Sequence, residues 1–111
     1  MPSPLRAAAI YGHAKAVQLL VEEGADVNAK ASPDRATALS TAVFFGHTET
    51  VKLLIEYGAD IEAKNDQGST AMDSLKVDWE TTQFIVQLLQ IRVDRQVVEQ
   101  GRAKVAELLR Q

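Results

Sequence analysis

The amino-acid sequence predicts an all-α fold in which short helix–turn–helix units stack side by side as a solenoid. The chain repeats itself: residues 12–27, GHAKAVQLLVEEGADV, correspond to residues 46–61, GHTETVKLLIEYGADI, at a spacing of 34 positions. In both segments valines and leucines recur at helical spacing and mark one apolar face. A single helix pair cannot bury such a face alone, so consecutive units are expected to stack.

The first unit is expected to occupy residues 1–30. Ala7, Ala8 and Ala9 lie in its short first helix, where small side chains allow neighbouring helices to approach closely. Gly12 ends that helix and lets the chain reverse, and Gly24 follows the second helix in the position of a left-handed C-cap. A polar segment, Asp-Val-Asn-Ala-Lys, then leads through a β-turn or hairpin-like loop into the next unit.

The second unit is expected at residues 31–64 and the third at residues 65–111, so that residues 1–111 form a single domain. The third unit lacks the expected Gly-His, and Trp79 stands in its place. Residues 101–109, GRAKVAELL, match the second helix of the other units better than the segment after Trp79 does. Residues 79–100 are therefore interpreted as an insertion, with a helix at 80–93 and Asp94 capping a second short helix.

The inserted helix is apolar around most of its circumference, and this allows two interpretations. It packs over the open end of the stack and closes it with Trp79, or it is a recognition or dimerisation element. The cap is preferred here, because an unprotected terminal repeat exposes apolar surface.

The recurrence of Gly-His, a Leu-Leu pair and Gly-Ala-Asp in one order resembles the ankyrin repeat, whose period is about 33 residues. The resemblance covers nearly the whole chain. It implies a non-catalytic module that binds a partner protein through a concave groove formed by turn tips and first helices. On this chain it points to first-helix residues and tip residues as the partner-binding surface, with Trp79 beside them: Ile10, Tyr11, Phe44, Phe45, Val77 and Asp78, then Ser32, Asp34, Arg35, Asn65, Asp66 and Gln67.

Phe44 and Phe45 are the most informative of these residues. Only one of the two rings can lie against the neighbouring helices, so the other is expected to be exposed, and exposed aromatic rings are favoured interface anchors. A packing role is the better explanation for Tyr11 and Phe45. For Phe44 the packing and binding explanations are equally good.

Composition excludes several other classes of protein. With 111 residues, a net charge of −3 and scattered basic residues, the chain lacks the basic field that nucleic-acid binding requires. Without cysteines it has neither disulfides nor thiolate metal ligands, and no run is apolar enough for a membrane span or a secretion signal. A cytoplasmic monomer is expected, with a dimer through the inserted helix as the alternative.

No catalytic, cofactor or metal site is expected. His13 and His47 occupy equivalent positions in adjacent units, where helix spacing keeps them too far apart for one ion, so bonds to the loops are expected. Asp26 and Asp60 also repeat, at turns where they are expected to bond local backbone amides. Neither a nucleophile elbow nor a phosphate-binding glycine loop is present.

Overall fold

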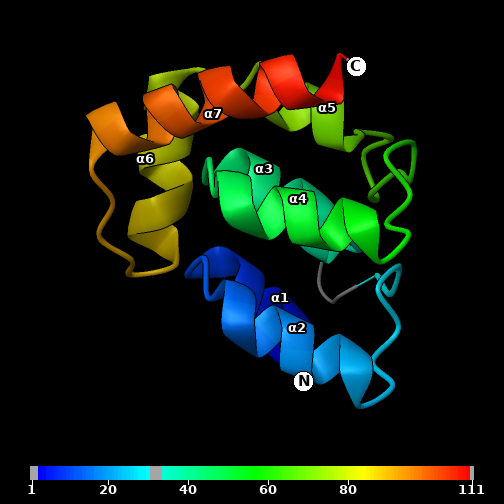
Figure 1. Ribbon diagram of the computed structural model, residues 1–111. Coiled ribbons are helices and arrows are strands. Elements are labelled where there is room, and N and C mark those ends of the chain that lie inside the picture. Colours follow the sequence, from blue (N-terminus) through cyan, green and yellow to red (C-terminus); the bar gives the residue numbers. More distant parts are fainter. Residues whose placement is uncertain (1–2, 31–33, 111) are drawn as a thin grey trace.

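A computed structural model of the chain describes residues 3–30 and 34–110, and within these residues it contains helices and no strands (Figure 1). The helices are α1 (Pro4–Ile10), α2 (Ala14–Glu22), α3 (Ala38–Phe44), α4 (Thr48–Glu56), α5 (Ala71–Ser74), α6 (Trp79–Leu88) and α7 (Arg95–Leu109).

Six of these helices form three stacked pairs. The first helices α1, α3 and α5 lie against one another in one row, and α2, α4 and α7 form the second row (Figure 1). The connections between successive units gather at one edge of the stack, and the turns within the first two pairs gather at the opposite edge. The predicted all-α stack of helix–turn–helix units is confirmed.

Hydroxyl side chains begin the first helix of each pair. Ser3 accepts a hydrogen bond from the backbone N–H of Arg6, and Thr37 accepts one from Ser40 in the equivalent position. Thr70 begins α5 with a reciprocal capping box in which the Asp73 carboxylate accepts from the Thr70 backbone N–H. The repetition of these caps explains why helices start at matching points in each unit.

The core lies mainly in the second unit, between its two neighbours. Leu39 and Val43 on α3, and Val51 and Leu54 on α4, are fully buried. The first unit adds Val17 and the third adds Val105, also fully buried. The middle pair therefore supplies the largest share of the apolar seam, as expected when each unit packs only on its neighbours.

The inserted segment differs from the prediction in its boundaries. Helix α6 ends at Leu88, because Gln90 adopts a left-handed conformation with φ of 57° and closes the helix. The backbone N–H groups of Gln90 and Ile91 donate to the carbonyl oxygens of Gln87 and Val86, which is a Schellman motif without glycine. The predicted extension of this helix to residue 93 is therefore wrong.

Helix α7 begins at Arg95, directly after Asp94, and it is one long helix where two separate helices were predicted. The Asp94 carboxylate accepts from the N–H groups of Gln96 and Val97 and so caps the helix start, as the sequence suggested. The helix then continues without a break through Gly101. Our assignment of Gly101 to the start of the second helix is wrong, because this glycine lies in the middle of α7, where α7 crosses Gly46.

Helix α6 lies along the side of the stack, at the edge that carries the turns within the first two pairs (Figure 1). It runs across the layers and leaves the outer surface of α5 and α7 uncovered at the end of the stack. The preferred interpretation of the insertion as a cap over that end is therefore wrong.

In the part of the chain that the structure describes, none of the helices is long and apolar enough to cross a membrane.

Candidate functional site

The two turn tips lie against each other and form one surface. The backbone N–H of Asp66 donates to the carbonyl oxygen of Asp34 at 3.0 Å, and Arg35 Nε lies 3.8 Å from Asp66 Oδ1. Asn65 shapes its own turn by accepting from the backbone N–H of Gln67 at 2.9 Å. Ser32 lies outside the described residues. We call the surface formed by Asp34, Arg35, Asn65, Asp66 and Gln67 the tip surface.

A bidentate ion pair fixes the tip surface to the first unit. Arg6 on α1 donates from Nη1 and Nη2 to the two carboxylate oxygens of Asp34, at 2.8 and 2.9 Å. Burial raises the pKa of Asp34, but hydrogen bonds from Arg6 and from the N–H of Ala36 outweigh burial and leave it below the ordinary value. Asp34 therefore stays ionised in mild acid and holds the first tip in place.

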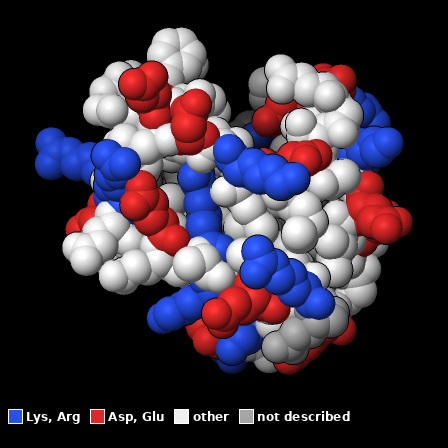
Figure 2. Space-filling model, turned by 90° about the horizontal axis from the view of Figure 1, so that it is seen from above, with Lys and Arg blue, Asp and Glu red and all other residues white. Residues whose placement is uncertain are grey.

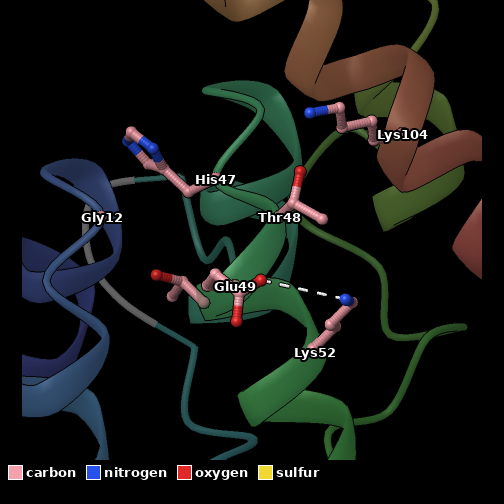
Figure 3. A pocket seen from close by; sticks show the side chains of 7 residues that line it. Gly12, His47, Thr48, Glu49, Lys52 and Lys104 are labelled. Carbon is pink, nitrogen blue, oxygen red and sulfur yellow. Dashed lines mark ion pairs between the residues drawn. The ribbon is translucent and has the colours of Figure 1, made fainter.

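A histidine of the second unit contacts the end of helix α1. His47 Nε2 lies 2.9 Å from the carbonyl oxygen of Ile10, which it donates to when that nitrogen carries the proton. The ring lies so close to the α1–α2 turn that a Cβ on Gly12 would be 2.6 Å from His47 Nδ1 (Figure 3). A bond from His47 to a loop was expected; the acceptor is the last residue of α1, next to the α1–α2 turn. Tyr11, which follows Ile10 in the chain, is 57% exposed.

The two phenylalanines do not divide into one buried and one freely exposed ring. Phe45 is buried at 4% exposure, and Phe44 is half-buried, with the two rings edge to face at 4.9 Å. The guanidinium of Arg102 lies 4.8 Å from the centroid of the Phe44 ring and covers part of it. Phe44 is thus a less accessible anchor than the sequence suggested, because a cation from α7 reaches it.

Arg102 replaces the missing histidine of the third unit. Its Nε donates to the carbonyl oxygen of Phe44 at 2.7 Å, and Phe44 is the repeat equivalent of Ile10. Its Nη1 donates to the carbonyl of Val77 and its Nη2 to the Thr82 hydroxyl, both at 3.0 Å. The side chain is buried at 7% exposure. Burial lowers the pKa of Arg102, although a guanidinium still stays charged at neutral pH.

Val77, Asp78 and Trp79 lie away from the tip surface and line a cleft at the end of the stack. This end cleft has a volume of about 530 Å³ and lies between α5, the turn that follows it, and α7. The Arg95 guanidinium lies 5.3 Å from the centroid of the Trp79 ring. Asp78 caps α6 by accepting from the N–H of Thr81 at 2.7 Å, and this bond lowers the pKa of its carboxyl group.

The other clusters of polar residues have structural partners. A shallow pocket of about 440 Å³ lies along α4, between the α1–α2 turn and Lys104 of α7 (Figure 3). It contains Glu49 and Lys52, which pair with each other at 3.8 Å. Asp26 and Asp60 accept from backbone N–H groups two residues ahead, as predicted. Within residues 3–30 and 34–110, no group of three or more His, Asp and Glu side chains is arranged to hold a metal ion.

The stacked pairs, the side chains that join them and the contacting tips define a helical repeat protein. Residues 2–74 match the family model of ankyrin repeats in three copies, which covers well over half of the chain. The chain therefore belongs to the ankyrin repeat family, whose members are generally protein–protein interaction modules and typically non-catalytic. The match ends with α5, so α6 and α7 lie beyond it. A comparison with curated proteins gives no match.

Proposed function

We propose that this chain is a non-catalytic module that binds a partner protein through the tip surface and the exposed ends of the first helices. The observation that carries the proposal is the contact between the tips, through the Asp66–Asp34 hydrogen bond and the Arg35–Asp66 ion pair. These bonds and the Arg6–Asp34 pair hold the tip surface in place before a partner binds. Binding would therefore cost little conformational entropy in this chain.

The most suitable anchor at the exposed ends of the first helices is Tyr11, which follows α1. Its ring is more than half exposed, stacks only loosely on His13 at 6.0 Å, and supplies a large contact area at low entropic cost. Gln67 at the second tip is exposed, and its side chain offers a hydrogen-bond donor and acceptor. Recognition would combine this aromatic anchor with polar contacts at the tips.

The double substitution Tyr11→Ala with Gln67→Ala is expected to weaken partner binding about tenfold or more, since hot-spot side chains contribute above 1 kcal/mol each. Partners captured by the unaltered chain are to be measured against both proteins by surface plasmon resonance, with circular dichroism to confirm the fold. Lys15→Ala with Gln18→Ala, on α2, is the control. Equal binding by the tip variant, or equal loss with the control, would contradict the proposal.

A second candidate function is self-association through α6. Phe84 and Leu88 are 61% and 67% exposed and share one face of the helix at i, i+4 spacing. No charged residue occurs from residue 81 to residue 91, between Glu80 and Arg92. An uncharged face can meet its own copy without like-charge repulsion, and an antiparallel pairing would bring the acidic start of one helix toward the basic segment after the other.

Light scattering over micromolar to millimolar protein concentration tests this candidate. If α6 pairs two chains, Leu88→Asp is expected to convert a dimer into a monomer, because it would bury an unpaired carboxylate in the interface. Leu19→Asp, a matched change at a half-exposed leucine on α2, should leave the dimer intact. A chain that is monomeric throughout this concentration range has no such interface.

A further inference from the structure

The end cleft has an apolar floor at the surface where another helix pair would continue the stack. Met72 and Leu75 supply one side of the floor, and Ala103 and Ala106 on α7 supply the other. All four side chains retain some exposure. The two alanines leave room for the backbone of a segment to approach α7 closely, as small residues do between packed helices. The shape therefore suits a short helix.

The cleft also carries an excess of positive charge. Four cations line it, Lys76, Arg95, Arg102 and Arg110, against two carboxylates, Asp78 and Glu99. The chain as a whole has a net charge of −3, so this local excess opposes the overall balance. Figure 2 looks down on this end of the stack, where Lys and Arg side chains lie in and beside a hollow near the middle of the view.

Arg95 and Glu99 pair with each other, which leaves three cations, Lys76, Arg102 and Arg110, against one carboxylate, Asp78. Glu99 accepts from Arg95 Nε at 2.8 Å, and Asp78 caps the start of α6. Among the described residues, none of the ion pairs within 4.0 Å includes Lys76, Arg102 or Arg110. Arg102 donates its hydrogen bonds to two carbonyl oxygens and a hydroxyl group. None of these acceptors carries a negative charge that would neutralise the guanidinium.

We propose that the end cleft binds an acidic amphipathic helix of a partner protein, with aliphatic side chains on the floor and carboxylates against Lys76 and Arg110. The charge excess explains the preference for an acidic segment, and the apolar floor explains the preference for a protein over a polyanion. Nucleic acid is disfavoured because the net negative charge of the chain repels a phosphate backbone. This site is separate from the tip surface.

Trp79 provides a direct measurement, since it is the only tryptophan in the chain and lines the cleft. The probes are two synthetic peptides with leucine at i, i+3, i+4 and i+7, flanked by glutamates in one and by lysines in the other. The glutamate peptide is expected to change the Trp79 emission and to bind about tenfold more tightly than the lysine peptide, with affinity falling as salt rises.

Lys76→Glu with Arg110→Glu is expected to reduce affinity for the glutamate peptide about tenfold, as the two rim charges are reversed. Lys15→Glu with Lys30→Glu makes the same charge change at exposed residues outside the cleft and should have little effect. The Tyr11→Ala and Gln67→Ala variant should bind the peptide normally, which separates this site from the tip surface. Equal affinity for the two peptides, no saturable Trp79 response, or a response to a single-stranded oligonucleotide instead would overturn the proposal.

Discussion

Gly101→Ala is expected to destabilise the fold by about 3 kcal/mol, near the upper end of what an extra methyl group costs in a packed interior. A Cβ on Gly101 would overlap the carbonyl oxygen of Gly46 and lie 2.8 Å from the Gly46 Cα. Both atoms belong to the backbone, so α7 would have to move away from the turn between α3 and α4. Helix propensity alone predicts the opposite sign, because alanine favours a helix interior over glycine by about 1 kcal/mol.

Urea denaturation followed by circular dichroism measures this effect. Gln100→Ala is the matched control, since it adds no volume at the exposed neighbouring position of the same helix. The control is expected to change the free energy of unfolding by less than about 0.5 kcal/mol. A Gly101→Ala variant more stable than the unaltered chain would show that α7 does not cross Gly46 at this distance.

Arg102→Met is expected to cost about 2–4 kcal/mol, because it removes three donated hydrogen bonds while keeping most of the apolar volume of the side chain. The carbonyl oxygens of Phe44 and Val77 would lose a charged donor, and the Phe44 ring would lose its contact with the guanidinium. The Thr82 hydroxyl would keep its bond to the Asp78 carbonyl at 2.8 Å. The desolvation of the buried cation is relieved, which reduces the cost without reversing it.

The loss should be concentrated in α6, because Arg102 joins that helix to α3 and α7. Amide hydrogen exchange is therefore expected to speed up in α6 before it does in α3 and α4. Arg102→Lys, which keeps the charge without the planar group, should be intermediate in stability. Arg92→Met, at an exposed residue of the loop between α6 and α7, serves as the control. If Arg102→Met unfolds no more readily than this control, the side chain does not hold the insertion in place.

The first two units could be predicted from the sequence because their signals are local. Ser3 and Thr37 begin helices within three residues of the amide they cap, and Gly12 and Gly46 end helices through bonds to the preceding turn. The 34-residue spacing then repeats each signal. The positions of the two turns follow from the same spacing, whereas the binding role of the residues they carry stays a prediction.

The third unit was harder because its signals are ambiguous or distant. Gly101 satisfies the pattern of a helix-start glycine, yet its small size is needed where α7 crosses Gly46. Gln90 ends α6 although neither glycine nor proline marks the point. Arg102 bonds residues 58 and 25 positions away, Phe44 and Val77. No pattern in the sequence identifies a side chain whose partners are so remote, and the cations of the end cleft share this difficulty.

Two hydrogen bonds join consecutive units, His47 to the Ile10 carbonyl and Arg102 to the Phe44 carbonyl. They differ in how early both partners are present as the chain is synthesised. The bond to Ile10 comes from His47, in the second helix pair. The first two pairs therefore have the residues that join them once the second pair has left the ribosome. The bond to the Phe44 carbonyl comes from Arg102, more than fifty residues further along the chain. Until α7 emerges, the face of α4 that meets it has no cover, and a nascent chain paused in that interval would expose the same surface to chaperones.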